Sequence, residues 1–514
     1  MVRCRQVLSL RPGVSGDSTW WENGVVRAVG RAAEVDQQAP SWIPRYNLPE
    51  AILTPGFVDG HTHFGMWALA RQRVHLAGAT TRKEALTRIS AGVPEDGWLR
   101  GHGWAANGWE AMPDRWSLDT VTSGPACLDS NDVHSAWVNS AALAAAGIDR
   151  LTADPPGGSV VRDGNGEPTG LLLEHAVSLV ASLIPGPDPA RLLAAMRAAQ
   201  SVAHSFGVTG IHDVEGPDAL RAFRQLEADD QLRLRVLFHP PVAQLPLLLA
   251  HGVRSGEGTD WLRLGGVKLF LDGSLGSRTA WMLEPYEDGR DRGMPLASEA
   301  EAAGAVDLAA GGGIACVIHA IGDAAVRRAL DLLSHARTVA IPHRIEHFQC
   351  AHPADVGRAA AHGIVVSMQP AHLPGDVALA ESRWGKRAAG AYRFRSLLRE
   401  GSVLAFGSDV PVATPDPRVG VYAAMVRPAG MSGGTDGWHG EERIDFDQAV
   451  RAYTSGNATA AGQSGHRGYL APGADADLVA WRCDPTVLRG DGAAFRDATV
   501  ALTVVRGEVV HQAR

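Results

Sequence analysis

The chain has 514 residues, of which 45% are hydrophobic and 20% are charged. This is the composition of an ordinary globular protein, and it excludes a collagen-like, coiled-coil or largely disordered architecture. The 48 Lys and Arg residues against 56 Asp and Glu residues give a formal net charge of −8, and no basic block occurs along the chain. We therefore expect no nucleic-acid surface and no contact with an anionic membrane.

The five cysteines are far apart and form no C-x-x-C pair. This spacing argues against a disulfide framework and against a thiolate zinc site. Any transition metal is therefore expected on nitrogen and oxygen ligands, and the chain offers 20 histidines. The first residues lack the apolar core of a signal peptide, and no apolar run approaches the roughly 18 residues of a membrane span, so we expect a cytoplasmic protein.

Both ends of the chain contain short strand-like segments broken by Gly and Pro. In the last fifty residues, 477–481 and 500–505 have the β-branched character of strands, and a turn follows at Gly507. Two β-rich ends around a helical middle predict that 1–50 and 465–514 pair to form one small β-sandwich domain.

The middle of the chain, 51–464, alternates between apolar strand candidates and amphipathic helices. Eight strands are predicted, over 52–58, 207–212, 232–239, 263–271, 313–319, 343–348, 363–369 and 403–408. The helices between them are predicted over 189–204, 217–229, 298–310, 323–335, 354–361 and 393–399. Eight strands that are each followed by a helix or connection predict an α/β fold, namely a (β/α)8 barrel.

One connection is too long for this pattern. The segment 64–206 follows the first barrel strand and contains a Trp-rich stretch with Trp98, Trp104, Trp109 and Trp116. We expect it to be an insertion that caps the barrel. The Trp-rich stretch is compatible with an aromatic substrate group, and equally with the hydrophobic core of the cap.

The first candidate ligands are His61 and His63, in the segment Pro-Gly-Phe-Val-Asp-Gly-His-Thr-His that starts at Pro55. On a strand, residues i and i+2 face the same side, so the two imidazoles converge and Thr62 turns away. This geometry suits one metal ion. Taken alone, the pair is equally compatible with two surface histidines in a loop.

Lys268 lies in an apolar strand candidate, Leu264 to Leu271. A buried lysine is costly unless it is paired or neutral. A neutral amine can react with carbon dioxide, and the resulting carbamate has two oxygens that can bridge two cations. The alternative is a lysine that points into solvent at the end of the barrel.

Three further segments place polar side chains at the ends of apolar strands, where barrel enzymes carry their chemistry. They end in His319, in Glu346-His347 and in Asp409. His343-x-x-Glu346-His347 also matches an inverted zincin pattern, which requires a helix. In a strand the two histidines lie about 13 Å apart. We therefore reject the protease motif and assign His343 to the scaffold. Each ending is ambiguous alone, but five in one chain predict a metal site.

The ordered set of motifs resembles the amidohydrolase superfamily. It consists of the His61 segment, Val267 to Ala280, His319-Ala-Ile-Gly-Asp, Arg-Ile-Glu-His347 and Gly-Ser-Asp409-Val-Pro. The resemblance covers nearly the whole chain, including 134–140 and 473–478. It is strongest to the branch, amidohydrolase family 3, that includes N-substituted formamide deformylase. It implies that the metal ligands are His61, His63, Lys268 as a carbamate, His319, His347 and Asp409.

The resemblance also suggests side chains that contact the substrate. These are Asp272 and Arg278, which directly follow the Lys268 strand, together with His134, Asn139, Trp104, Asp323 and Glu174. For each of them, a structural role in capping, a turn or a salt bridge explains the residue equally well.

The implied activity is metal-dependent hydrolysis of an amide, N-formyl or cyclic amide C–N bond in a small molecule. Metal-activated hydroxide would attack the carbonyl, and Asp409 would carry the proton to the leaving amine. One or two Zn²⁺ ions are expected, with iron or manganese as alternatives. The alternative functions are a deaminase of an aminated heterocycle, a non-catalytic binding protein and, by fold analogy only, a polyester or phosphotriester hydrolase. A homodimer is the default assembly.

Overall fold

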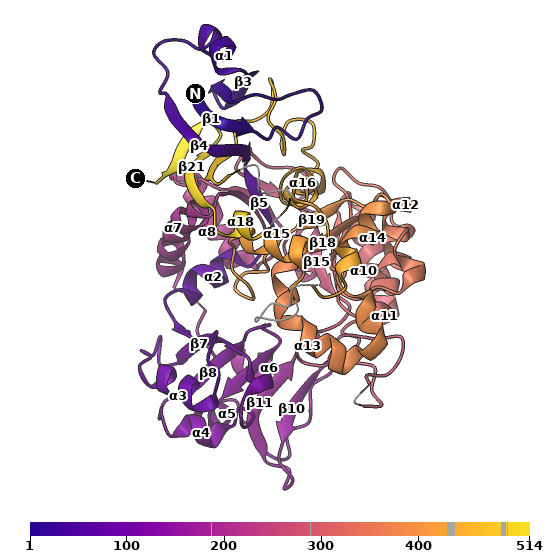
Figure 1. Ribbon diagram of the computed structural model, residues 1–514. Helices are drawn as coiled ribbons and strands as arrows, with labels where there is room; N and C mark the ends of the chain where they lie inside the picture. Colours follow the sequence, from indigo (N-terminus) through magenta and orange to yellow (C-terminus); the bar gives the residue numbers. More distant parts are fainter. Residues whose placement is uncertain (187, 288, 429–436, 485–489, 491, 514) are drawn as a thin grey trace.

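The computed structural model describes residues 1–513 except 187, 288, 429–436, 485–489 and 491. Four β-sheets organise these residues. Figure 1 shows a β-rich region that carries both termini, a central α/β body and a separate lobe formed by residues 74–181. No helix among the described residues is long and apolar enough to cross a membrane.

Both chain ends contribute to one seven-stranded sheet of order β22-β21-β20-β4-β1-β2-β3. Among the described residues, hydrogen bonding joins these strands into a single sheet instead of the two separate sheets of the predicted β-sandwich. A bridge between Val25 and Asp475 ties the β3 edge back to the chain before β20, and the sheet therefore curls around its own core. The strands are β1 Val2–Val7, β2 Ser18–Glu22, β3 Val25–Gly30, β4 Tyr46–Pro55, β20 Leu478–Arg482, β21 Thr499–Val505 and β22 Glu508–Gln512.

The central body contains two all-parallel sheets. One has the order β14-β13-β12-β5 and the other β15-β16-β17-β18-β19. Their strands are β5 Phe57–Thr62, β12 Val208–Asp213, β13 Arg235–Phe238, β14 Leu262–Leu264, β15 Val267–Phe270, β16 Cys316–Ala320, β17 Arg344–His347, β18 Val365–Met368 and β19 Leu404–Phe406. The predicted strand at 263–271 is interrupted at Gly265-Gly266, so the strand pairing gives two sheets instead of one continuous eight-stranded barrel.

Two isolated parallel bridges join these sheets. Pro241 pairs with Lys268 at one junction, and Thr62 pairs with Val410 at the other. At the second junction the amide of Asp409 also donates to the carbonyl of His61, at 2.7 Å. Gly407 permits this approach, because a Cβ at that position would lie 2.3 Å from the amide nitrogen of His61.

Helices cover the parallel strands. Strands such as β16 are buried along their whole length, as parallel strands covered on both faces are. Helix α11, for example, contacts β16, and Ala325, Ala329 and Leu332 belong to its buried face. The helices of the body are α2 Phe64–Ala70, α7 Pro189–Ser205, α8 Pro217–Ala228, α9 Leu245–Ala250, α10 Glu299–Gly311, α11 Asp323–Ser334, α12 Arg358–Ala361, α13 Leu373–Trp384, α14 Phe394–Arg399, α15 Pro417–Val426, α16 Phe446–Arg451, α17 Asn457–Ala460 and α18 Gly492–Arg496; α1 Ala32–Gln38 lies beside the terminal sheet.

The part of the insertion from β6 to α6 forms the lobe on the opposite side of the body from the terminal sheet (Figure 1), whereas its two ends, α2 and α7, pack on the body. Its six-stranded sheet has the order β10-β11-β9-β8-β7-β6. The strands are β6 Val74–His75, β7 Leu99–Trp104, β8 Ala126–Ser130, β9 Ser135–Val138, β10 Gly158–Arg162 and β11 Pro168–Glu174, with helices α3 Arg82–Ser90, α4 Arg115–Asp119, α5 Ser140–Ala145 and α6 Val177–Ala181. Trp104 and Trp137 are buried in its core, so much of the Trp-rich stretch packs the lobe itself.

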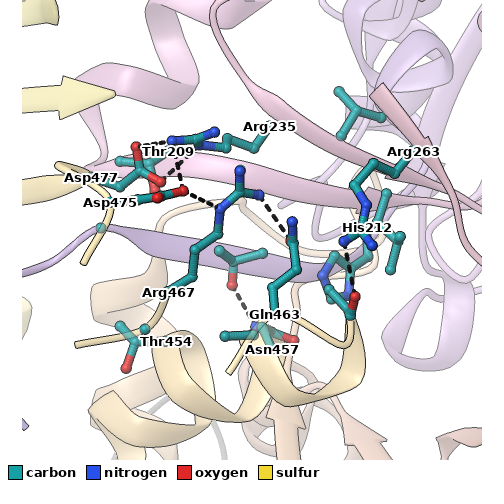
Figure 2. A pocket seen from close by; sticks show the side chains of 18 of the residues that line it. Thr209, His212, Arg235, Arg263, Thr454, Asn457, Gln463, Arg467, Asp475 and Asp477 are labelled. Carbon is teal, nitrogen blue, oxygen red and sulfur yellow. Dashed lines mark hydrogen bonds and ion pairs between the residues drawn. The ribbon is translucent and has the colours of Figure 1, made fainter. Parts of the chain in front are cut away.

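Buried arginines connect the terminal sheet to the body. The guanidinium of Arg235 on β13 lies 2.8 Å from Asp477 and 3.1 Å from Asp475, and Arg467 lies 2.7 Å from Asp475. Figure 2 shows these side chains around a cavity of about 40 Å³. Because the cations and carboxylates are paired with one another, this cluster joins the two parts of the chain.

Trp481 on β20 provides the apolar part of the same connection. Its ring packs against Phe57 and Phe495, with centroids 5.1 and 4.9 Å away, and its indole N–H donates to Thr54 Oγ1 at 2.9 Å. We predict that Trp481→Ala destabilises the protein by about 3–5 kcal/mol, because it leaves a cavity at this junction. The measurement is the urea unfolding midpoint by circular dichroism. Trp42→Ala is the control, since Trp42 is 71% exposed and should cost little. Equal midpoints for the two variants would contradict this account.

Candidate metal centre

A cavity of about 260 Å³ lies at the carboxyl ends of the parallel strands. The body and the insertion both contribute to its wall. From the body come His61, His63, Lys268, Phe270, Leu296, His319, His347 and Asp409, and from the insertion Asp132, Val133, His134, Glu174 and His175. All six predicted metal ligands therefore line one cavity.

His61, His63 and Asp409 form a compact group. Their potential ligand atoms lie within 4.8 Å of one another. Asp409 Oδ1 is 3.1 Å from His63 Nε2 and 3.4 Å from His61 Nε2. Thr62 turns the other way, as the strand geometry predicts, and donates to the Asp213 carboxylate at 3.0 Å.

Hydrogen bonds to the other ring nitrogens fix the orientation of both imidazoles. His61 Nδ1 contacts the carboxylate of Glu346, and His63 Nδ1 donates to the carbonyl of Val214 at 2.7 Å. Both Nε2 atoms therefore face Asp409 Oδ1, the third potential ligand of the group. A partner that fixes the tautomer in this way is characteristic of metal-binding histidines.

The electrostatics of this group favour an ionised Asp409. Burial acts to raise the pKa of Asp409, but the neighbouring His61, His63 and His347 hold it well below its usual value. Burial acts to lower the pKa of His63, and its hydrogen bond to Asp409 raises it overall. Asp409 is therefore a carboxylate at neutral pH.

Lys268, His319 and His347 lie on the adjoining part of the cavity. The rings of His319 and His347 are 4.4 Å apart, and His347 is 5.3 Å from His61. Burial lowers the pKa of His319 and His347 well below the usual value, so both are neutral. His319 Nε2 donates to the carbonyl of Gly273 at 3.1 Å, which leaves Nδ1 available.

Lys268 is 3% exposed, and burial lowers its pKa to about 8. The predicted alternative of a solvent-facing lysine is therefore wrong. Its Nζ lies 4.8 Å from the centre of the Phe270 ring. No hydrogen bond or ion pair of this amine is found among the described residues.

Two of these residues have backbone conformations that are unusual for their type. His347 has φ 70° and Asp409 has φ 59°. Left-handed conformations at residues other than glycine cost free energy and occur preferentially at functional sites. Here each one directs a side chain into the cavity at the end of its strand.

Glu346 contacts a predicted metal ligand, and the sequence reasoning did not single it out. Fully buried, it contacts both His61 Nδ1 and the guanidinium of Arg344, which in turn bonds His212 at 2.8 Å and Ser367 at 2.9 Å. Arg344, His61 and Lys268 hold the pKa of Glu346 well below its usual value, although burial opposes this. The sequence did contain a signal: Glu346 directly precedes the predicted ligand His347 and lies two positions after Arg344 in an apolar strand.

The residues present fit a divalent metal ion. The chemistry of the donor set, imidazole nitrogen with carboxylate oxygen, is that of zinc and neighbouring transition metals. Three donors within 4.8 Å come close to the spread of ligands that each lie about 2.0–2.2 Å from one ion. Neutral imidazoles whose second nitrogen is already bonded have a lone pair available for a metal.

Several predicted substrate contacts have structural positions instead. Asp272 is fully buried and accepts hydrogen bonds from the amides of Trp281, Ile321 and Gly322. Asn139 caps α5 by accepting from Ala142 N. Both side chains are bonded to backbone groups and are absent from the described cavity wall, although Asp272 Oδ1 lies 3.7 Å from His319 Nε2.

Three more predicted contacts lie away from the cavity. Trp104 is in the core of the insertion, and its indole N–H donates to the carbonyl of Leu128. Asp323 begins α11 and accepts from Leu283 N. Arg278 lies 3.2 Å from Asp291. None of the three belongs to the described lining of the cavity.

His134 and Glu174, in contrast, do line the cavity. His134 Nδ1 is 2.8 Å from Glu174 Oε2. Burial opposes a charge on His134, but Glu174 raises its pKa to about 9. The ring of His134 lies 5.6 Å from that of His319, so the insertion reaches the predicted metal ligands.

Solved structures with this fold belong to a recognisable class. A metal-dependent hydrolase from Pyrococcus horikoshii OT3, described as uncharacterised, superposes with a TM-score of 0.78 and 25% identity, over 95% of this chain and 98% of that one. The fold and the His–Asp site thus define a hydrolase that uses a metal ion.

The chain belongs to the amidohydrolase family, whose profile, described as "Amidohydrolase family", matches residues 46–511. The YtcJ protein of Bacillus subtilis (strain 168) is 30% identical over 98% of this chain and 97% of its own length. N-substituted formamide deformylase of Arthrobacter pascens is 27% identical over 90% of this chain and 89% of its own. The resemblance found in the sequence is confirmed.

The bond between Glu346 and His61 leads to a testable prediction. Glu346→Gln should weaken zinc affinity by about 10–100-fold, because partners of this kind orient the imidazole and raise its basicity. Competition with a chromogenic chelator measures this affinity. Asp355→Asn is a matched control, since Asp355 is a buried carboxylate paired with Arg327 and Arg358 away from the site. Equal affinity in wild type and Glu346→Gln would show that Glu346 does not support the site.

Proposed function

We propose that the protein hydrolyses a C–N bond, of an amide or N-formyl type, in a small molecule. The convergence of two imidazole Nε2 atoms and the Asp409 carboxylate in a cavity shared with Lys268, His319 and His347 carries this proposal. The likeness to N-substituted formamide deformylase supports the choice of bond.

The ligand set divides into two metal sites. His61, His63, Asp409 and Lys268 would hold one ion, and Lys268, His319 and His347 would hold the other. Zinc is proposed because imidazole nitrogen predominates among the ligands. A bound divalent ion supplies Lewis acidity at the carbonyl and lowers the pKa of water.

Lys268 is proposed to bridge the two sites as a carbamate. Its nitrogen adds to the carbon of carbon dioxide and loses a proton to solvent, which leaves an anion with two oxygens. Burial that lowers the pKa of this amine to about 8 supports the reaction, because only the neutral amine is nucleophilic.

Asp409 is proposed to move the proton. Its low pKa keeps it ionised and able to accept a proton from the attacking water. It then gives that proton to the leaving nitrogen as the C–N bond breaks, so that the carbonyl carbon gains an oxygen and the amine leaves neutral. Its position beside His61 and His63 keeps it next to the reacting centre.

We further propose that the two parallel sheets together form the (β/α)8 barrel, closed by the bridges at Lys268 and Val410. This barrel would span 51–464, with 64–206 as its cap and 1–50 plus 465–514 as the small β-domain. The likeness of nearly the whole chain to the Pyrococcus hydrolase supports this division.

Elemental analysis of the purified chain is the first test. About two zinc or similar ions per chain are expected from the two ligand sets. The loaded protein is then assayed with formanilide, hydantoin and cytosine, and hydrolysis of formanilide is the expected result. Turnover of cytosine alone would make it a deaminase. No bound metal, even after reconstitution with zinc, would overturn the catalytic proposal in favour of a binding protein.

Asp409→Asn separates metal binding from proton transfer. We predict a fall in kcat of about 10²–10⁴-fold on formanilide, because the amide cannot accept the proton. Lys268→Ala should lose bound metal as well as activity. Asp355→Asn again serves as the control. Full turnover by Asp409→Asn would remove this residue from the chemistry, and full metal content in Lys268→Ala would remove the carbamate bridge.

A further inference from the structure

His134 occupies a position that the mechanism above does not use. It follows the turn between β8 and β9 in the insertion, and its side chain is 16% exposed. Because Nδ1 is bonded to Glu174 Oε2 at 2.8 Å, the orientation of the imidazole is fixed. His134 lines the cavity, and no hydrogen bond to its other ring nitrogen, Nε2, is found among the described residues.

Two carboxylates clamp this part of the insertion to the body. Asp132 accepts from Ser274 Oγ at 2.8 Å and from Ser277 Oγ at 3.4 Å, and also from the amide of His134 at 3.2 Å. Glu174 accepts from the Thr279 hydroxyl through Oε1 while Oε2 holds His134. Ser274, Ser277 and Thr279 all belong to the loop after β15, which carries Lys268. These hydrogen bonds therefore fix the position of His134 relative to the loop that follows the Lys268 strand.

These clamps also determine which groups the wall can bind. The oxygens of Asp132 and Glu174 are already bonded, so neither is a ready partner for a cationic substrate group. The wall also includes three apolar side chains, Val133, Phe270 and Leu296. His175, which also lines the cavity, is exposed and bonds the carbonyl of Pro156 at 3.0 Å. His134 is thus a largely buried polar residue of the insertion whose ring lies 5.6 Å from that of His319.

We propose that His134, as an imidazolium whose Nδ1–H is held by Glu174, is a catalytic residue that donates a hydrogen bond from Nε2–H to the carbonyl oxygen of the substrate. The bond strengthens as that oxygen becomes an oxyanion during attack on the carbonyl carbon. The preferred substrates are uncharged amides with an apolar substituent. This inference rests on the proposed amide hydrolysis.

The physical basis is preorganisation. A donor that is fixed before the reaction does not have to reorient when charge develops, and in a site shielded from water its effect is large. The Glu174 bond and the two clamps supply this fixation, because rigid supporting contacts decide whether a site keeps its geometry. The insertion would then supply part of the catalytic machinery as well as cover for the barrel.

The test compares zinc-loaded wild type with His134→Leu, His134→Gln and Glu174→Gln. His75→Leu is the matched control, since His75 is an exposed histidine of the same lobe that does not line the cavity. The substrates are formanilides with different para substituents. Phenylphosphonate serves as a tetrahedral anionic probe, with binding measured by calorimetry. Metal content is determined for every variant.

We expect His134→Leu to lower kcat by about 10²–10³-fold with unchanged metal content and little change in KM, as loss of an oxyanion donor does. His134→Gln keeps an N–H donor and should recover part of the rate, and Glu174→Gln should lie between the two. Phenylphosphonate should bind more weakly to His134→Leu than to wild type or His75→Leu.

The outcomes separate this inference from the proposed function. If wild type cleaves formanilides and His134→Leu has the same kcat, or if the phosphonate binds both equally, the role of His134 is wrong. If wild type cleaves no formanilide but its phosphonate affinity still depends on His134, amide hydrolysis is wrong and the hydrogen-bonding role stands. A loss in His134→Leu that is matched fully by His134→Gln, with KM and kcat changed together, would indicate a merely structural role.

Discussion

The centre of the molecule depends on the ion pair between Arg344 and Glu346. Both side chains are almost completely buried on β17, and charges in such a place are tolerated only when they are paired and fully hydrogen-bonded. Arg344 meets this condition through Glu346, the Gly60 carbonyl, His212 and Ser367, which come from four different strands. The same pair leaves one oxygen of Glu346 for His61. A single buried ion pair therefore holds strands together and sets the orientation of a ligand.

The remainder of the site follows from the way parallel strands end. Each strand brings its last residues to the same edge, so side chains distant in the sequence share one cavity. Close approach of the backbones at Gly407 brings Asp409 next to His61, and the left-handed residues His347 and Asp409 turn their side chains inward. The bridge at Lys268 connects the second group of ligands to the first sheet. The ligands thus span both sheets, which makes their relative position sensitive to how the sheets meet.

Much of this arrangement was predictable because it is encoded locally. The apolar strand at 313–319 and the helix at 323–335 correspond to β16 and α11, within three residues at each boundary. The histidines were recognisable because a polar residue that ends an apolar run is conspicuous. Asp272 and Asn139 were grouped with the substrate contacts because a carboxylate or amide that caps backbone amides has the same local sequence as one that faces a ligand. The role of Glu346 and the pairing of Glu174 with His134 depend on contacts across 285 and 40 residues, which no local pattern contains.

The curled sheet at the chain ends was predicted as a sandwich for the same reason, since register between distant strands is a tertiary property.

The insertion is the part of the chain whose sequence indicates least about its role at the cavity. Its own cores account for most of its tryptophans, although Trp116 is exposed, so its composition says little about the ligand. What relates it to the chemistry is two acidic side chains, Asp132 and Glu174, bonded to hydroxyls of the loop after β15. Hydrogen bonds to a carboxylate are stronger than those between neutral groups and are directional. The lobe is therefore held at the strand that carries Lys268, and substitutions at Ser274, Ser277 or Thr279 would act on the cavity through the position of the insertion. A family that varies such a lobe while retaining the strand ends can change the group facing its metal ligands without altering the ligands themselves.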